Sequence, residues 1–218
     1  MAQLENQVVG IFAKQPLPGR VKTRMCPPLS PSEAASLYET SLVETVFAMT
    51  DGDFDLVLFY AGNVEWFRTA FPRLRLIPQE GSDLGERMAT ALQQLQADYQ
   101  KAALIGSDSP DLPTAMVEKA FNSLDSDGLV VIPARDGGYV MVAEQGHHPQ
   151  VFRNVPWSTA EVLTSTRRLA AEHSISLHEV GEWEDLDDLE ALQNLLQRSP
   201  SSRTAAFVRE NFWDSLPV

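Results

Sequence analysis

Short apolar runs alternate along the chain with longer segments in which apolar residues recur every three or four positions. The short runs are typical of buried strands, and the longer segments are typical of amphipathic helices. Strands that alternate with helices predict a mainly parallel sheet covered on both faces, a three-layer α/β/α fold. A glycine turn at 136–138 predicts a hairpin, which would make the sheet mixed. The expected strands cover residues 7–13, 54–60, 74–77, 102–105, 129–133, 139–143 and 175–180.

Capping patterns predict where several helices begin. Ser30, Pro31 and Glu33 predict a helix to about residue 49, because serine caps a helix, proline suits its first position and glutamate returns a bond to the cap. Ser158 with Glu161 repeats this pattern ahead of a helix to about residue 172. Further helices are expected over residues 84–99, from about residue 113, and from about residue 187.

The length of 218 residues fits one domain, with a core over about 7–196 and a tail over 197–218. Phe207, Phe212 and Trp213 of the tail either fold back on the body or meet a second subunit in a homodimer. The sequence has no apolar run of membrane-spanning length and no targeting segment, so we expect a cytoplasmic protein without a membrane partner. Cys26 is the single cysteine, which excludes an internal disulfide.

The charge of the chain is strongly negative and unevenly distributed. A formal net charge of −13 argues against a nucleic-acid partner, because nucleic acids are bound through basic surfaces. Residues 14–24 nevertheless carry four cations and no acid, whereas residues 179–190 carry seven acids and no base. This distribution indicates a small anionic ligand.

The basic segment directly follows the first expected strand, where ligands bind in α/β sheets. Its cations and its glycine suit a cradle for a diphosphate. It is not a Walker loop, because Val21 stands where that motif has a glycine before the lysine. The candidate phosphate-binding residues are Lys14, Gly19, Arg20, Lys22, Thr23 and Arg24, and Lys22 and Arg24 are also candidate catalytic residues.

Carboxylates follow two later strands. Asp108 lies at the end of the strand at 102–105 and is a candidate metal ligand and catalytic residue, whereas Asp111 is expected to cap the next helix. Asp185 and Asp187 follow the last strand and could complete the metal shell. For Asp187 a helix cap with Glu190 as its partner is an equal alternative.

Three smaller features complete the candidate site. Arg87 stands in the first turns of a helix, where the helix dipole disfavours it, so it either reaches an anion or is simply exposed. The segments at 136–139 and 157–159 could line an acceptor pocket. Alternatively, the first merely forms a turn and the second merely begins a helix. Their residues are Asp136, Gly137, Gly138, Tyr139, Trp157, Ser158 and Thr159.

In order along the chain, the motifs FAK (12–14) with PGRVKTR (18–24), DLGER (83–87), GSDSPDLP (106–113), DGGY (136–139) and WST (157–159) form a recognisable set. This set resembles a family of bacterial glycosyltransferase-like proteins, the selenodomain-associated transferases, over about residues 7–196. The resemblance implies the GT-A fold of the nucleotide-diphospho-sugar transferases, a superfamily that includes phospholactate and molybdenum-cofactor guanylyltransferases. By analogy, Asp108 takes the place of the metal-binding acid and Asp185 or Asp187 that of the later ligand.

The resulting expectation is a transferase that uses Mg²⁺ or Mn²⁺ and a nucleotide-activated donor. Glycosyl transfer from a nucleotide sugar to an unidentified acceptor is the leading hypothesis. Nucleotidyl transfer with release of pyrophosphate is the alternative, although the glycine-rich opening loop of nucleotidyltransferases is missing here. A protein that binds a nucleotide without catalysis is the alternative from another class.

Overall fold

The computed structural model describes residues 5–212, and within that range the chain forms a seven-stranded sheet in the order β3-β2-β1-β4-β6-β5-β7. Strand β6 is antiparallel to β4 and β5, and the other neighbouring strands are parallel. The mixed sheet and its hairpin are therefore as predicted. The strands are β1 (Glu5–Lys14), β2 (Asp55–Ala61), β3 (Arg75–Pro78), β4 (Tyr99–Gly106), β5 (Gly128–Pro133), β6 (Tyr139–Gln145) and β7 (Ser176–Glu179).

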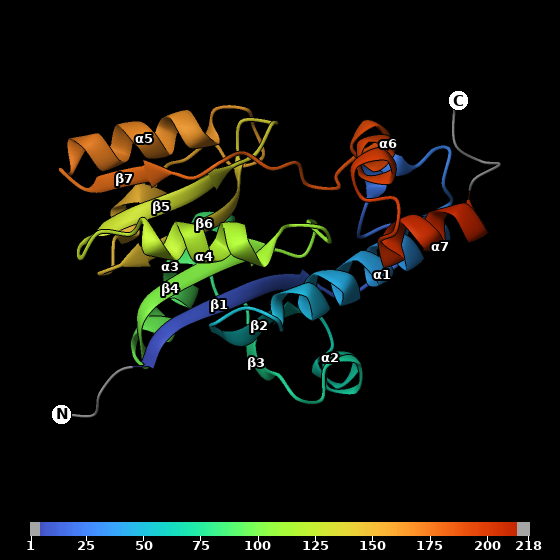
Figure 1. Cartoon of the computed structure of the whole chain (residues 1–218), viewed down its shortest axis with the longest axis horizontal. Helices are drawn as coiled ribbons and strands as arrows, with labels where there is room; N and C mark the ends of the chain where they lie inside the picture. The colour runs from blue at the N-terminus through green and yellow to red at the C-terminus, as the bar shows by residue number, and fades with distance from the viewer. Residues whose placement is uncertain (1–4, 213–218) are drawn as a thin grey trace.

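Helices cover both faces of the sheet (Figure 1). Helices α1, α2 and α4 pack on the face that carries Val9 and Ile11, while α3 and α5 pack on the face that carries Val8. These layers confirm the three-layer α/β/α fold. The helices are α1 (Pro31–Met49), α2 (Val64–Ala70), α3 (Leu84–Gln96), α4 (Thr114–Asn122), α5 (Val162–Glu172), α6 (Leu189–Arg198) and α7 (Arg203–Asn211), with 3-10 turns η1 (Thr23–Met25) and η2 (Pro149–Phe152). None of the helices in the described range is long and apolar enough to cross a membrane.

A third apolar cluster lies outside the two sheet faces. It joins Met25, which directly follows the basic loop of residues 14–24, and Leu37 of α1 to Leu192 of α6 and Val208 of α7. Figure 1 shows α6 and α7 lying beside α1, far from β5 and β7. The described part of the tail therefore folds back on the body, whereas Trp213 lies outside the described residues.

Two predicted capping boxes have opposite outcomes. The one at α1 is confirmed, because Ser30 Oγ accepts a hydrogen bond from the Glu33 amide at 3.3 Å and Glu33 Oε2 accepts one from the Ser30 amide at 2.7 Å. The one at Ser158 is wrong, since α5 begins at Val162 without a side-chain cap. Ser158 has φ 64°, so it turns the backbone ahead of the helix instead of capping it.

Two aspartates predicted or considered as caps have other partners. Asp188, not Asp187, caps α6 by accepting a hydrogen bond from the Ala191 amide at 2.9 Å. Asp111 does not cap α4, because Pro113 holds the cap position. The carboxylate of Asp111 binds Arg198 instead. Neither Asp111 nor Asp187 is therefore the N-cap of a helix, although the spacing of each suggested it.

Candidate active site

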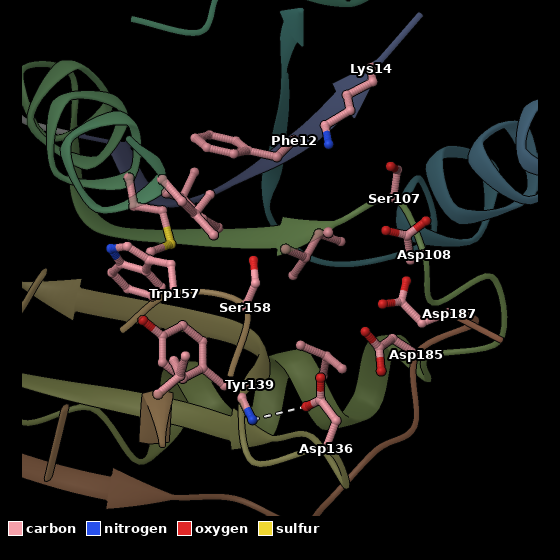
Figure 2. A pocket seen from close by; sticks show the side chains of 18 of the residues that line it. Phe12, Lys14, Ser107, Asp108, Asp136, Tyr139, Trp157, Ser158, Asp185 and Asp187 are labelled. Atoms are coloured by element: carbon pink, nitrogen blue, oxygen red, sulfur yellow. Dashed lines mark hydrogen bonds between the residues drawn. The ribbon is translucent and has the colours of Figure 1, made fainter. Parts of the chain in front are cut away.

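A cleft of about 730 Å³ opens at the carboxyl ends of β1 and β4 and the start of β6. Its walls come from the basic loop after β1, the loop after β4, the β5–β6 turn, the segment before α5 and the loop before α6. The parallel strands explain this convergence, because their carboxyl ends share one edge of the sheet. Figure 2 shows the cleft with its carboxylates and aromatic rings facing one another.

Lys22 lies between two of the acidic side chains. Its Nζ is 2.5 Å from Asp108 Oδ1 and 3.3 Å from Asp187 Oδ1, and only 4% of its side chain is exposed. The backbone at Lys22 is left-handed, with φ 48°. Burial alone lowers the pKa of Lys22, but the charges of Asp108 and Asp187 outweigh it, so the pKa is raised and the ammonium group stays charged.

The two acidic loops are also joined directly. The amide of Leu186 donates a hydrogen bond of 2.7 Å to the carbonyl oxygen of Asp108. Arg24 adds a second cation, with its Nη1 3.2 Å from Asp187 Oδ2. The structure thus brings Lys22 and Arg24 of the basic loop to Asp108 and Asp187, which lie far from that loop in the sequence.

Asp185 lies among other acids. Burial raises the pKa of its carboxyl group most, and the charges of Asp187, Asp136 and Asp108 raise it further, to about 6. No cation contributes to this shift. Added positive charge near Asp185 would therefore stabilise its ionised form.

The divalent cation that the resemblance implies would need oxygen ligands from the carboxylates of the cleft. Within residues 5–212, no three His, Cys, Asp or Glu side chains are arranged to enclose a metal ion. A magnesium ion, however, commonly takes one or two carboxylates and completes its shell with substrate phosphates and water. Asp185 and Asp108 offer carboxylate oxygens, and burial together with the charges of neighbouring acids disfavours the ionised form of Asp185 when no cation is near. The donor set therefore fits such an ion.

The remaining phosphate candidates occupy different positions. Lys14, Arg20 and Thr23 line the cleft, and so does Arg87, whose Nε donates to the Gly81 carbonyl oxygen at 3.1 Å. Gly19 is not among the lining residues; it has φ 74° and shapes the basic loop.

The acceptor candidates mostly face the cleft. Asp136, Gly138, Tyr139, Trp157, Ser158 and Thr159 line it. Asp136 Oδ1 accepts a hydrogen bond of 2.9 Å from the Gly138 amide, which fixes the turn. Gly137 packs against the backbone of Ala160, where a β-carbon would come within 2.3 Å of its carbonyl oxygen. Gly137 is therefore a structural residue of the turn.

Several lining residues were not predicted from the sequence. Tyr38 of α1 hydrogen-bonds Ser107 at 2.8 Å and accepts from the Lys14 amide at 2.9 Å, and burial raises the pKa of its phenol. Phe12, Leu84 and Met88 also line the cleft. Phe12 and Met88 have the residue type and spacing of ordinary core residues, so the sequence does not mark them as cleft residues. Leu84 stands in the first turn of a helix after a glycine-containing loop, and this position is a local indication of a binding site.

Comparisons with known proteins agree with this architecture. The model of the family described as "Uncharacterized protein conserved in bacteria (DUF2064)" matches residues 42–159. The crystal structure of a proposed nucleotide-diphospho-sugar transferase from Desulfovibrio desulfuricans G20 is similar, with 31% identity, a TM-score of 0.88, and coverage of 95% of this chain and 96% of that one. No curated protein matches the sequence.

More distant structures share the fold. A nucleotidyl transferase from Methanothermobacter thermautotroptrophicus has 13% identity and a TM-score of 0.61, over 96% of this chain and 100% of that one. A manganese complex of a protein from Mycobacterium tuberculosis H37Rv has 15% identity and a TM-score of 0.56, over 89% of this chain and 100% of that one. The comparisons confirm the resemblance, the fold class and the enzyme class, which is a transferase.

Proposed function

The chain belongs to the DUF2064 family, and from this premise we propose that it transfers a glycosyl group from a nucleotide-diphosphate sugar to a hydroxyl group of an acceptor. The observation that carries the proposal is the meeting of a basic loop with three carboxylates at the carboxyl edge of the sheet. A diphosphate needs cations, and a divalent ion bound to that diphosphate needs carboxylates. The 31% identity to a proposed nucleotide-diphospho-sugar transferase supports the choice of donor.

In this proposal the residues of the basic loop bind the diphosphate. Lys14, Arg20 and Arg24 line the cleft from the side of β1, and Lys22 lies deepest, against Asp108. Negative charge develops on the diphosphate oxygen as its bond to the sugar breaks. Fixed cations in a partly buried cleft stabilise that charge without having to reorganise. Lys22 and Arg24 are therefore the proposed catalytic cations.

Asp108, Asp185 and Asp187 are the proposed ligands of Mg²⁺ or Mn²⁺, which would neutralise charge on the leaving diphosphate. Asp108 and Asp187 also hold Lys22 in place. Asp136 lies on the opposite wall, with Oδ1 fixed by the Gly138 amide. Its second oxygen is suited to take the proton from the acceptor hydroxyl group.

Product analysis tests this function directly. The protein would be incubated with nucleotide sugars or nucleoside triphosphates, with Mg²⁺, Mn²⁺ or chelator, and with mixed alcohol and sugar acceptors. We expect release of a nucleoside diphosphate from one nucleotide sugar, only with metal. Pyrophosphate release from a triphosphate would instead indicate nucleotidyl transfer. Nucleotide binding that ignores metal, without any product, would favour a non-catalytic binding protein.

A matched pair of variants tests the site. Asp108→Asn removes a charge that contacts Lys22, so product formation should fall by at least about a hundredfold, as is usual when a charge that supports the transition state is lost. Asp51→Asn makes the same change at an exposed position outside the cleft and should leave the rate unchanged. Normal turnover by Asp108→Asn in magnesium would contradict the assignment.

A further inference from the structure

A chain of hydrogen bonds reaches the charged end of the cleft, which is the end at which Figure 2 shows Asp108, Asp185 and Asp187. The chain begins at the backbone amide of Lys14, which donates a hydrogen bond of 2.9 Å to the hydroxyl oxygen of Tyr38. That oxygen lies 2.8 Å from Oγ of Ser107, the residue directly after β4. The contacts thus join the ends of β1 and β4 through a side chain of α1.

The buried phenol of Tyr38 determines the direction of these hydrogen bonds. Tyr38 is only 3% exposed, and burial raises the pKa of its hydroxyl group, so the group keeps its proton at neutral pH. Within residues 5–212, its hydrogen-bond partners are the Lys14 amide and the Ser107 hydroxyl group. The amide can only donate, so Ser107 Oγ is the acceptor of the phenolic proton. The opposite direction would leave a buried donor without an acceptor, which costs free energy.

This direction leaves Ser107 with a proton of its own to donate. A serine hydroxyl group has one donor and two acceptor positions, and Tyr38 occupies an acceptor position. In the described part of the chain, Ser107 Oγ forms a hydrogen bond with Tyr38 alone. Although Ser107 is only 3% exposed, it lines the cleft. Its proton is therefore available to an oxygen atom of a ligand in the cleft.

The neighbours of Ser107 indicate which ligand oxygen this is. Figure 2 shows Ser107 between Lys14 and Asp108, and the hydrogen bonds through Tyr38 link it to the Lys14 backbone. Lys14 is one of the proposed cations for the diphosphate, and Asp108 is one of the proposed ligands of the metal ion. A diphosphate that contacts both the cation and the metal ion passes Ser107. A hydroxyl donor also forms a stronger hydrogen bond with an anionic phosphate oxygen than with a neutral oxygen.

We propose that Ser107 donates a hydrogen bond to a non-bridging oxygen of the donor diphosphate, and that Tyr38 is the positioning residue that directs this proton. The inference rests on the proposed function and deepens it, because it adds an uncharged donor to the cations of the basic loop. Tyr38 belongs to a helix, so the donor is already oriented before the diphosphate binds. The centre of its ring also lies 5.9 Å from Lys22 Nζ, so one side chain supports two groups that face the diphosphate.

Ser41 of α1 offers a matched control for Ser107. Its hydroxyl group donates to the Ser107 carbonyl oxygen at 3.5 Å, and its side chain is fully buried. Ser41 is not among the residues that line the cleft. Ser41→Ala therefore removes the same group as Ser107→Ala from the same neighbourhood, but on the side away from the ligand.

Calorimetric titration of the full chain with methylenediphosphonate and Mg²⁺ tests the hydrogen bond, because this probe resembles a diphosphate without a sugar or a nucleoside. Ser107→Ala should weaken binding by about tenfold or more, which is the usual effect of losing a hydrogen bond to a charged group. Ser41→Ala should leave the affinity unchanged.

Tyr38→Phe tests the positioning role, since it removes the hydroxyl group and keeps the ring beside Lys22. The affinity for methylenediphosphonate should fall about threefold, because the Ser107 proton is no longer directed toward the cleft. In the Ser107→Ala background the same substitution should change the affinity by less than about twofold, because both residues act through one hydrogen bond. Equal losses in the two backgrounds would show that Tyr38 acts apart from Ser107, which contradicts the positioning role.

The outcomes separate this inference from the proposed function. If the wild-type protein binds methylenediphosphonate with metal and Ser107→Ala binds it equally well, the hydrogen bond is wrong and the donor assignment stands. Weaker binding of Mn²⁺ alone by Ser107→Ala, measured by electron paramagnetic resonance, would make Ser107 a metal ligand and overturn the inference. If Ser107→Ala does not fold, Tyr38→Phe decides, and its unchanged affinity would be the contradicting result. If the wild-type protein binds no diphosphate with metal, the proposed function fails and the inference fails with it.

Discussion

At the scale of single residues, the charged end of the cleft contains one buried cation, Lys22, among several acidic side chains. Lys22 compensates Asp108 and Asp187 within the protein, whereas no cation among residues 5–212 contributes to the pKa shift of Asp185. Repulsion among these carboxylates raises the free energy of the folded protein. A cationic ligand, or protonation of one carboxyl group, lowers that free energy. Residues kept at some cost to folding are typical of functional sites.

The first prediction concerns Asp185 and pH. Its pKa is raised from 3.8 to about 6 in the folded state, so the ionised form opposes folding above pH 6. Wild-type stability should therefore rise as pH falls from about 6 toward 4. Asp185→Asn should stabilise the protein at pH 7.5 by about 1 kcal/mol, below the ~3 kcal/mol that the full pKa change would give, because solvent screens part of it.

Urea unfolding at pH 7.5 and pH 5, in the presence of chelator, measures this effect. The gain from Asp185→Asn should shrink at pH 5, since wild-type Asp185 is already largely protonated there. Asp51→Asn, at an exposed position, should change stability by less than about 0.5 kcal/mol at either pH. A pH-independent effect of Asp185→Asn would show that the charge of Asp185 is not its cause.

At the scale of elements, α6 clamps the two acidic loops together. Arg198, at the end of α6, contacts Asp111 Oδ2 with Nε at 2.7 Å and Glu184 Oε2 with Nη1 at 2.6 Å. Its guanidinium group also lies 5.2 Å from the Trp183 ring centre. Asp111 shares a loop with Asp108, and Glu184 precedes Asp185, so the clamp determines the spacing of the carboxylates in the cleft.

We predict that Arg198→Ala lowers the free energy of unfolding by about 2 kcal/mol, because it leaves two largely buried carboxylates without their partner. It should also weaken Mn²⁺ binding, measured by electron paramagnetic resonance. Arg198→Lys should restore only part of either property, since lysine lacks the fork that reaches both acids. Arg168→Ala, which breaks an exposed i,i+4 pair, should change stability by less than about 0.5 kcal/mol and leave Mn²⁺ binding unaltered.

The elements also show what could be predicted from the sequence. The strands, the hairpin and the cap at Ser30 depend on residues close in sequence, and they were predicted correctly. The cap at Ser158 failed because the local pattern was overridden by a left-handed turn at φ 64°. The contact of Lys22 with Asp187 spans 165 residues, and the Arg198 clamp spans 87. Such pairs result from the fold as a whole. Local sequence patterns could therefore identify the single residues as candidates, but they could not predict which residues contact each other.

At the scale of the whole molecule, the third apolar cluster supports the charged end of the cleft. It contains Met25 directly after the basic loop and Leu186 between the two acidic residues of the last loop. Helix α7 completes it through Val208, which is fully buried. The described part of the tail, residues 197–212, therefore holds both charged loops against α1, although none of these residues lines the cleft.

This arrangement predicts that two equally buried valines differ in their effect on binding. Val208→Ala in α7 and Val8→Ala in the first half of β1 each remove two methyl groups from a fully buried side chain, so each should cost about 1–2 kcal/mol of stability. Only Val208→Ala should weaken binding of the nucleoside diphosphate, by several-fold, because its cluster carries the two charged loops. Denaturant unfolding and isothermal titration calorimetry with Mg²⁺ measure both quantities. Equal loss of affinity in the two variants would mean that binding follows global stability, and that the tail has no particular part in holding the loops.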